Sequence, residues 1–443
     1  MLFDVAALLT TSAALGPVAE AFSAHEISAL DTSLISSANI PATLPLDVID
    51  LPALPPEPFV GPQPAGSPGE LVQGTRLLQQ IALLPTSSIG EFIVANPDAI
   101  AGLMANPPAA TDVSAWWGSM GLASRNSLRA ASPQLVGNLD GIPFAIRDVA
   151  NREVLQATMA QLDTTIATAP GRSVVDAAKH QLSVLQSIAD ALAVPSETPR
   201  TLMSLDPTGQ GRAAIIMGDL RTADYVTYMV PGMFFTIEGQ MVYWSDAAAR
   251  MGEQQLQWLA HYGDTDSTVA TIAWIGYHTP NLTNIGSLVN AEEGRDSLAG
   301  AIEGLQALRA GDEPYISVIG HSYGSTAALM ALTEYDFEID ALAVVGSPGS
   351  AAQSVDELHV RDGNVFVGEA AWDPVPTSAF FGSEPGAPDY GATVFGTAGG
   401  VDPITGATLL RSFGHIEYFS PNTESLRNLA LITIGHGADI LAG

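Results

Sequence analysis

The chain has 443 residues, of which 47 are acidic and 16 basic, so its formal net charge is −31. This charge argues against nucleic acids and anionic membranes as partners, because no basic patch is available to neutralise phosphates. Hydrophobic residues make up 47% and charged residues 14% of the chain, enough for a large core, and the length predicts two folded units. The absence of cysteine excludes a thiol nucleophile, disulfides and thiolate metal sites.

The first 68 residues carry two features of their own. Val5–Ala19 is mostly apolar and ends in small residues, as a secretory segment would. However, Asp4 stands where a basic residue is expected, and the run is too short to span a bilayer, so a secreted and a cytoplasmic location both stay open. Nine prolines between residues 41 and 68 indicate an extended strap or linker, and we take 1–68 as a proline-rich N-terminal segment.

Residues 69–205 have the apolar spacing of helices. Apolar residues recur near every 3.6 positions, and proline and glycine separate the runs. We expect a helical domain here, with helices over Leu71–Ala82, Ile89–Met104, Val113–Ala130, Phe144–Ala167 and Val174–Leu192. The adjacent Trp116 and Trp117 are expected to pack in its core rather than to form a substrate platform.

From residue 206 to 443, short apolar runs alternate with helical ones. This alternation is typical of an α/β fold with a doubly wound, mainly parallel sheet and helices on both faces. The expected strands are Ala213–Met217, Tyr225–Val230, Ala270–Ile275, Tyr315–Ile319, Leu342–Val345 and Val365–Glu369, with a weaker last strand at Leu409–Leu410. The expected helices are Gln240–His261, Ser287–Ala310, Ser325–Tyr335, Ser354–Leu358 and Thr423–Leu431.

The sequence Gly320-His321-Ser322-Tyr323-Gly324 lies between an expected strand and an expected helix. In that setting a G-x-S-x-G turn predicts a nucleophile elbow. The tight turn strains the backbone of the serine, and the two glycines leave room where strand and helix pack closely. Ser322 would then stand clear of the sheet, free to attack a carbonyl. The alternative is an ordinary glycine-rich turn, since the pattern also occurs by chance.

A serine hydroxyl needs a base within hydrogen-bond reach and an acid that orients the base. In a doubly wound hydrolase, the acid follows the second strand after the nucleophile, and the base comes last in the chain. By this count Asp373 is the acid, because it follows the strand Val365–Glu369. His415 is the base, because it follows the weak strand at Leu409–Leu410.

Three other residues compete for these roles. His436 is the alternative base, but it follows a further helix and so comes late for the role. Glu369 is the alternative acid, but a residue inside a strand points less reliably into the site. His321 precedes the nucleophile and is expected to pack beneath the elbow rather than to act on substrate.

Two backbone N–H groups are needed to stabilise the charge on the attacked carbonyl oxygen. The first is expected at Tyr323, directly after the nucleophile. The second is expected at Met233, after the strand Tyr225–Val230, where Gly232 lets the backbone turn. The sequence has no H-E-x-x-H spacing, G-x-G-x-x-G or P-loop, so we expect neither a metal nor a nucleotide cofactor.

Together these features resemble an α/β-hydrolase. More narrowly, the chain resembles an actinobacterial family of serine hydrolases formerly catalogued as a domain of unknown function, alpha/beta hydrolase family 8. The matching segments are Gly137–Pro143, Arg147–Arg152, Val230–Gly232, Trp274–Tyr277, Gly320–Ser325, Gly346–Gly349 and Phe413–Phe419. The resemblance implies the α/β-hydrolase fold and a serine hydrolase, but it implies no natural substrate.

The expected function is hydrolysis of a small-molecule or lipid carboxylic ester through an acyl-enzyme. Amidase, thioesterase or acyltransferase activity would use the same residues, and a binding protein without activity would retain the same fold. A free histidine has a pKa of about 6.5, so activity should rise between roughly pH 6 and 8. The segment between Val345 and Val365 is too short for an inserted helical lid. We therefore expect Asn138–Arg152 either to cover the site or only to make local turns.

Overall fold

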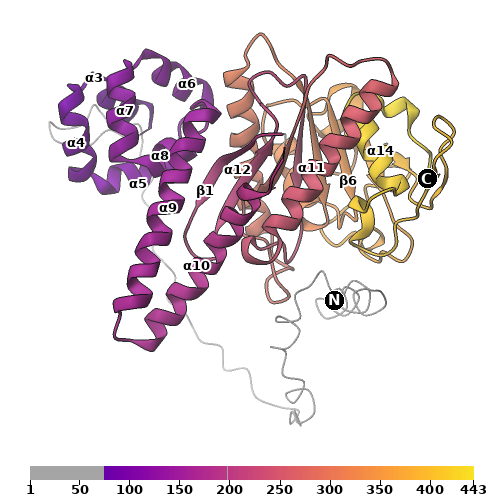
Figure 1. Ribbon diagram of the computed structural model, residues 1–443. Coiled ribbons are helices and arrows are strands. Elements are labelled where there is room, and N and C mark those ends of the chain that lie inside the picture. The colour runs from indigo at the N-terminus through magenta and orange to yellow at the C-terminus, as the bar shows by residue number, and fades with distance from the viewer. Residues whose placement is uncertain (1–73, 197) are drawn as a thin grey trace, which may run out of the picture.

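The computed structural model describes residues 74–196 and 198–443. The apolar run Val5–Ala19 and the proline-rich segment 1–68 lie outside the described residues. In Figure 1 the described chain forms a central sheet with helices packed on it and a group of short helices beside it. The α/β region predicted from the sequence, 206–443, contains β2 to β8 of that sheet, and the region predicted to be helical, 69–205, contains the group of short helices and most of β1.

The central sheet has eight strands in the order β1-β2-β4-β3-β5-β6-β7-β8. β2 runs antiparallel to both of its neighbours, and all other neighbouring strands are parallel. The strands are β1 (Arg200–Asp206), β2 (Arg212–Met217), β3 (Tyr225–Val230), β4 (Val269–Ile275), β5 (Tyr315–His321), β6 (Ala341–Val345), β7 (Val365–Gly368) and β8 (Thr393–Phe395). β5 lies between β3 and β6 in the middle of the sheet. The loop after β5 therefore lies at the carboxyl ends of the parallel strands, where ligands bind in sheets of this kind.

Helices cover both faces of the sheet because its inner strands are apolar on both faces. α12 (Val289–Leu308) and α13 (Tyr323–Glu334) pack on one face. α11 (Ile237–His261) and α14 (Glu424–Ile432) pack on the other face. The sheet is therefore the middle layer of three, and both sides of β5 are sealed from water.

The helical region has an apolar core of its own. Its helices are α3 (Thr75–Leu83), α4 (Ile89–Ala95), α5 (Pro97–Ala105), α6 (Ala110–Ser119), α7 (Leu122–Ala131), α8 (Pro133–Asn138), α9 (Phe144–Thr168) and α10 (Arg172–Ala193). Trp116 and Trp117 are 6% and 4% exposed and belong to this core, which confirms their predicted packing. Two expected long helices are each divided in two, because Pro97 starts a new helix and Gly121 precedes another.

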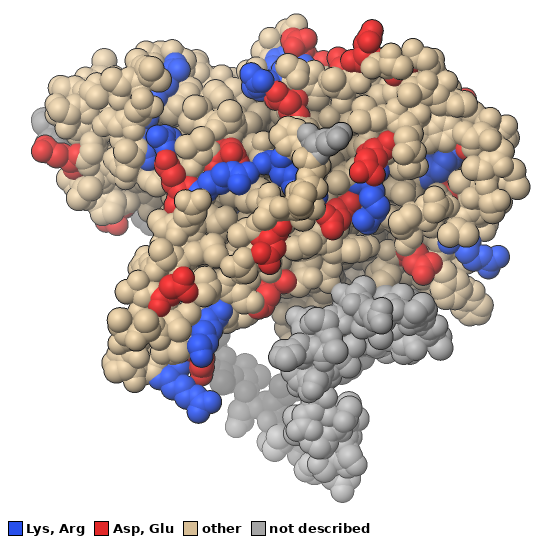
Figure 2. All heavy atoms as spheres, in the orientation of Figure 1, with Lys and Arg blue, Asp and Glu red and all other residues tan. Residues whose placement is uncertain are grey.

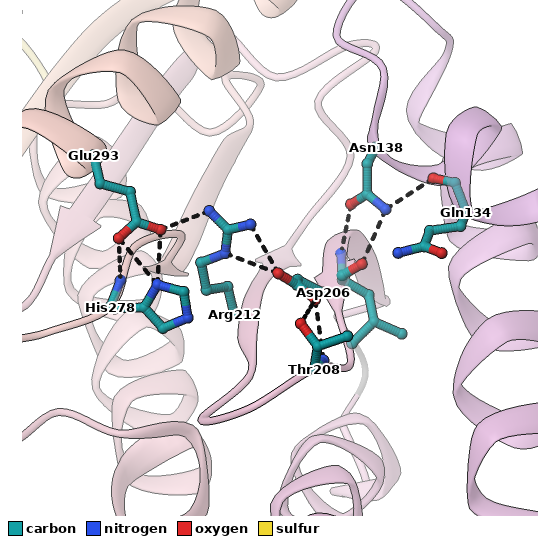
Figure 3. Close-up of polar contacts among 8 residues, drawn as sticks. Gln134, Asn138, Asp206, Thr208, Arg212, His278 and Glu293 are labelled. Atoms are coloured by element: carbon teal, nitrogen blue, oxygen red, sulfur yellow. Dashed lines mark hydrogen bonds and ion pairs between the residues drawn. The ribbon is translucent and has the colours of Figure 1, made fainter. Parts of the chain in front are cut away.

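Side chains of α8 and α9 cover the free edge of β1. Asn138 accepts a hydrogen bond from the amide of Leu205 and donates one to its carbonyl, each at 2.9 Å (Figure 3). Asp148 accepts from the amide of Leu202 at 2.7 Å, and Asn151 donates to the carbonyl of the same residue at 3.1 Å. These side chains satisfy backbone groups that a further strand would otherwise pair, so the edge of the sheet is closed.

A chain of charged groups ties β2 to α12 and to the loop after β4. Arg212 donates to Asp206 at 2.8 Å and to Glu293 at 2.7 Å, and Glu293 also lies 2.8 Å from Nδ1 of His278 (Figure 3). Burial alone would raise the pKa of Glu293, but the hydrogen bond from His278 and the charge of Arg212 lower it. The ionised carboxylate of Glu293 thus anchors the loop after β4 at His278.

Three parts of the sheet differ from the sequence prediction. The sheet begins at Arg200 rather than after residue 205, because β1 is a partly buried edge strand with polar residues and does not read as an apolar run. β8 has only three residues and gave no recognisable pattern. Leu409 does not join the central sheet: it lies in β10 (Thr408–Leu409), which pairs with β9 (Gly400–Val401) in a separate two-stranded sheet.

Charged side chains are spread thinly over the surface. On the face shown in Figure 2 basic side chains are few and scattered, and acidic side chains lie among them. Over residues 74–196 and 198–443, no helix combines the length and the hydropathy that a membrane crossing needs.

Candidate active site

Ser322 lies at a sharp turn between β5 and α13. Its backbone has φ 55° and ψ −132°, a conformation that non-glycine residues rarely adopt, and α13 begins at the next residue. Holding a residue in such a conformation costs on the order of 1–3 kcal/mol and is common where function requires it. The turn has the geometry of a nucleophile elbow.

Close packing explains both glycines of the turn. A Cβ atom at Gly320 would lie 2.6 Å from Cα of Ser325, at the start of α13. A Cβ atom at Gly324 would lie 2.6 Å from the carbonyl oxygen of Val230, at the end of β3. Any side chain at either position would therefore push the helix away from the sheet.

The structure brings Ser322, His415 and Asp373 together, although 93 residues separate the first two. Nε2 of His415 lies 2.7 Å from Oγ of Ser322. Nδ1 of His415 lies 3.0 Å from each carboxylate oxygen of Asp373. An ionised carboxylate only accepts hydrogen bonds, so the imidazole hydrogen is on Nδ1 and Nε2 is free to accept the serine proton.

The carboxylate of Asp373 is fully buried and has several hydrogen-bond donors. Besides His415, the amide of Val375 donates to Oδ1 at 3.0 Å and the hydroxyl of Tyr418 donates to Oδ2 at 2.6 Å. Burial alone would raise the pKa of Asp373, but His415, Tyr418 and the amide of Val375 lower it below its usual value. Asp373 is thus held ionised beside the imidazole.

His321 packs beneath the elbow, as predicted, and also contacts His415. Its Nε2 lies 2.8 Å from the main-chain carbonyl oxygen of His415, so this nitrogen carries the hydrogen and donates it. Burial, and next the charge of His415, lower the pKa of His321 to about 3. A neutral His321 therefore supports the loop that carries His415.

The chain after β3 runs directly against Ser322. A Cβ atom at Gly232 would lie 2.9 Å from Oγ of Ser322, so only glycine fits there. The backbone turn after β3 was predicted at Gly232, but the residue with a positive φ there is Phe234, at 64°. The amides of Met233 and Tyr323 have no acceptor in the described part of the chain, which leaves both available to a ligand.

The other two competing residues, His436 and Glu369, lie in different surroundings. His436 stacks on Tyr262 with ring centroids 3.9 Å apart, and its Nδ1 lies 3.3 Å from Asp439. Glu369 has no side-chain hydrogen bond within the described residues, and burial together with the charges of Glu384 and Asp373 raises its pKa. Neither residue contacts His415 or Ser322 through a hydrogen bond in the described chain.

A small apolar hollow adjoins Ser322, which is itself only 5% exposed. Phe381 is one of the residues that line it: its ring lies 5.5 Å from that of Tyr323, and its amide donates to the carbonyl of Pro348 at 3.1 Å. The residues that line the hollow beside Ser322 are Ile285, Tyr323, Pro348, Val375, Phe380 and Phe381.

The cover comes from a part of the chain that the sequence did not suggest. Val375, Phe380 and Phe381 all belong to the long connection between β7 and β8. The segment Asn138–Arg152 does not cover the hollow: it packs on β1, and no residue of 74–196 lines the hollow. The amide side chains of that segment match the free backbone groups of an edge strand, which explains their position.

Sequence reasoning missed Tyr418 and the aromatic residues of the cover. A signal for Tyr418 was present, because a residue three positions after His415 lies on the same side of a helical turn. Phe380 and Phe381 had no such signal, since they lie in a long connection without periodicity. In residues 74–196 and 198–443, no group of three or more His, Asp or Glu side chains is arranged to hold a metal ion.

Comparisons with known proteins agree with this architecture. Residues 206–383 match the family model described as alpha/beta hydrolase, a range that includes Ser322 and Asp373 and ends before His415. The chain is 28% identical over 387 residues to the uncharacterized protein Rv2079 of Mycobacterium tuberculosis, covering 76% of this chain and 57% of that protein. It is also 28% identical over 218 residues to the uncharacterized protein Rv0963c of the same species, covering 46% of this chain and 79% of that protein.

The chain thus spans 57% of the length of the longer relative. Among solved structures, a hyperthermophilic esterase from the archaeon Pyrobaculum calidifontis is similar with a TM-score of 0.33 and 12% identity, covering 64% of this chain and 97% of that one. Residues 206–383 match the alpha/beta hydrolase family model, and the mainly parallel central sheet, to which these residues contribute β2 to β7, has the α/β-hydrolase fold, as predicted from the sequence.

Proposed function

We propose that this chain hydrolyses carboxylic esters, with Ser322 as nucleophile, His415 as base and Asp373 as the residue that orients the base. The observation that supports this most strongly is the continuous hydrogen-bond path from Oγ of Ser322 through the imidazole to the buried carboxylate, 2.7 Å and 3.0 Å long at its two steps. Such a path activates a hydroxyl that is otherwise a poor nucleophile at neutral pH.

In the first half of the reaction, Oγ of Ser322 attacks the ester carbonyl carbon while its proton passes to Nε2 of His415. The carbonyl oxygen becomes an oxyanion, which accepts hydrogen bonds from the amides of Met233 and Tyr323. Each such donor lowers the barrier by about 3 kcal/mol. The tetrahedral intermediate collapses, the ester C–O bond breaks, and the alcohol leaves with the proton from His415.

In the second half, His415 removes a proton from water, and the resulting hydroxide attacks the acyl carbon on Ser322. The same two amides hold the second oxyanion. Collapse returns the proton from His415 to Oγ of Ser322 and releases the carboxylic acid. Asp373 stays ionised throughout, because it stabilises the imidazolium rather than taking its proton.

The hollow beside Ser322 favours a substrate with a short, uncharged acyl or alcohol group. Its lining is apolar apart from the hydroxyls of Ser322 and Tyr323, so a charged group there would lose its hydration without a partner. The rings of Phe380 and Phe381, 4.8 Å apart, limit its length. Short-chain esters fit these two conditions best.

Other uses of the same residues remain separate candidates. An amidase, thioesterase or acyltransferase would form the same acyl-enzyme and differ in the group that leaves or attacks. A non-catalytic binding protein would retain the fold without a reactive serine.

A fluorophosphonate probe and a panel of p-nitrophenyl esters of increasing acyl length test the proposal. We expect covalent labelling of the wild-type chain on Ser322, none of Ser322→Ala, and hydrolysis that is fastest for short acyl groups and increases between roughly pH 6 and 8. His436→Gln should match the wild type, because His436 lies elsewhere. Failure of the wild type to be labelled would favour the binding protein, and cleavage of thioesters or amides in preference to esters would favour the other enzymes.

A further inference from the structure

Two side chains of one short segment reach the same carboxylate. His415 and Tyr418 are three residues apart, and Tyr418 lies in the single-turn helix Glu417–Phe419. Nδ1 of His415 lies 3.0 Å from both oxygens of Asp373, and the hydroxyl of Tyr418 lies 2.6 Å from Oδ2. The segment therefore contacts Asp373 through an imidazole and a phenol at once.

The direction of the phenol hydrogen bond follows from its second partner. The amide of Ala370 donates to the hydroxyl oxygen of Tyr418 at 2.9 Å, so the hydroxyl hydrogen is left for Asp373. Burial, and next the charge of Asp373, raise the pKa of Tyr418 well above its usual value, so the phenol keeps this hydrogen over the whole range in which the enzyme would work. Tyr418 is thus a permanent donor to the carboxylate.

The position of Tyr418 is fixed from several sides. The side chain is fully buried, and its main-chain carbonyl accepts a hydrogen bond from the hydroxyl of Ser425 at 2.7 Å. Its ring lies 6.0 Å from that of His321, which in turn donates to the main chain of His415. A phenol held in this way acts as a rigid donor rather than as a mobile one.

The two oxygens of Asp373 are each held by one fixed donor. Oδ1 accepts from the amide of Val375 at 3.0 Å, and Oδ2 accepts from Tyr418 at 2.6 Å. Between these donors the carboxylate cannot turn, and both oxygens stay at 3.0 Å from Nδ1 of His415. Without Tyr418, Oδ2 would keep only its contact with His415, whereas Oδ1 would keep both His415 and the Val375 amide, so the carboxylate would be held less firmly.

We propose that Tyr418 is a positioning residue for the reaction proposed above: its hydroxyl fixes the plane of the Asp373 carboxylate and takes up part of its charge. This inference rests on the proposed function, since it concerns the orientation of the base. The titratable groups that face Asp373 are His415, His321, Tyr418 and Glu369. Removal of the phenol hydroxyl would take away the donor to Oδ2, leave the amide of Ala370 without its acceptor, and keep His415, His321 and Glu369 in place.

The test is Tyr418→Phe, measured by the dependence of kcat and KM on pH. The freer carboxylate would stabilise the imidazolium more strongly, so the acid limb of the kcat/KM profile should move to higher pH by about half a unit or more. We expect kcat to fall by about tenfold and KM to change by less than about twofold, because the substrate does not touch Tyr418. Replacing Tyr418 by 4-aminophenylalanine keeps an N–H donor at the same position. This variant should recover much of the wild-type kcat, and the acid limb of its kcat/KM profile should return toward the wild-type pH.

Tyr390→Phe is the matched control. Tyr390 is 2% exposed in the same domain, and its hydroxyl has no partner in the described chain, so its loss should leave kcat and the acid limb unchanged. A merely structural role of Tyr418 would lower the melting temperature of Tyr418→Phe but leave the limb where it is in the wild type, and that result would overturn the inference. If Tyr418→Phe does not fold, the variant with 4-aminophenylalanine in place of Tyr418 is measured instead. A kcat and an acid limb of the kcat/KM profile that match the wild type support the inference. A variant that folds but has a greatly reduced kcat overturns it.

Failure of the proposed function gives a different result. Fluorophosphonate labelling of the wild type at about pH 8 is done first. An unlabelled wild type overturns the proposed reaction, and this inference with it. If the wild type is labelled but the acid limb of the Tyr418→Phe profile is not shifted, only the role of Tyr418 is overturned.

Discussion

Nε2 of His321 donates a hydrogen bond to the main-chain carbonyl oxygen of His415, at 2.8 Å, so the residue before Ser322 holds the loop that carries His415. The rings of the two histidines lie 4.9 Å apart. This hydrogen bond joins the last residue of β5, His321, to the loop after β10 that carries His415. The contact lies next to the hydrogen bond between Ser322 and the imidazole of His415.

Replacing His321 by phenylalanine should slow the reaction. The ring would still pack against Phe235 and Phe419, but the hydrogen bond to the His415 carbonyl would be lost. A buried acceptor without a donor costs about 1–3 kcal/mol, so we expect kcat to fall by about fivefold to a hundredfold with little change in KM. Steady-state kinetics on a short p-nitrophenyl ester measure this, and an unchanged kcat would mean that the contact does not position the base.

The same substitution should alter the response to acid. Burial lowers the pKa of His321 to about 3, whereas a histidine in the unfolded chain has a pKa of about 6.5. Between these values the unfolded chain binds a proton that the folded chain does not, so folded-state stability decreases as pH decreases, by up to about 1.4 kcal/mol per pH unit. His321→Phe lacks this group and should lose stability less steeply from about pH 6.5 to 3 in urea titrations. Parallel curves for the two proteins would contradict the burial of a neutral His321.

Adding one methyl group at Gly232 should disable the site. The new Cβ atom would lie 2.9 Å from both Oγ of Ser322 and the carbonyl oxygen of His321, so the chain after β3 has to move away from the nucleophile. We expect Gly232→Ala to reduce kcat/KM by at least about tenfold and stability by about 1–3 kcal/mol. Gly90→Ala is the control: nothing lies within 4 Å of its Cβ position in α4, so it should fold at least as stably as the wild type and keep full activity.

Shortening the side chain of Phe381 should widen the range of substrates. Its ring packs between Phe380 and Tyr323 over the hollow, so Phe381→Ala opens space next to Ser322. The ratio of kcat/KM for an octanoyl ester to that for an acetyl ester should increase by at least about tenfold. Phe92 is partly buried and packs against the core of the helical region, so Phe92→Ala removes the same atoms away from the hollow and should leave the ratio unchanged. An unchanged ratio for Phe381→Ala would show that another part of the chain selects acyl length.

Asn138→Leu should weaken the fold without affecting the chemistry. The substitution leaves the amide and the carbonyl of Leu205 without their partners at the edge of β1. We expect a loss of about 1–3 kcal/mol in the free energy of unfolding, measured in urea, and a kcat/KM within about twofold of the wild type. The exposed Asn106, whose side chain has no hydrogen bond in the described residues, gives the matched control Asn106→Leu. A large loss of activity in Asn138→Leu would instead connect the helical region to the site.

Most of the sheet could be predicted from the sequence because its inner strands are short, continuous apolar runs. β3, for example, has the predicted bounds Tyr225–Val230, and β5 differs from its prediction only at its C-terminal end. The partly polar edge strand β1 was missed, because its amides are satisfied by side chains of α8 and α9 from more than fifty residues away. No local pattern reports that kind of pairing.

The sequence by itself determined the turn at Ser322 and the order of the candidate residues, because the turn depends on two neighbouring glycines and the order depends on counting strands. Only the tertiary structure places His415, and not His436, beside Ser322, and Asp373, and not Glu369, beside His415, because the residues that meet are 42 to 93 positions apart in the chain. It also decided that the cover of Ser322 comes from Phe380 and Phe381. Packing between distant segments, and not the local backbone, sets the shape of that hollow.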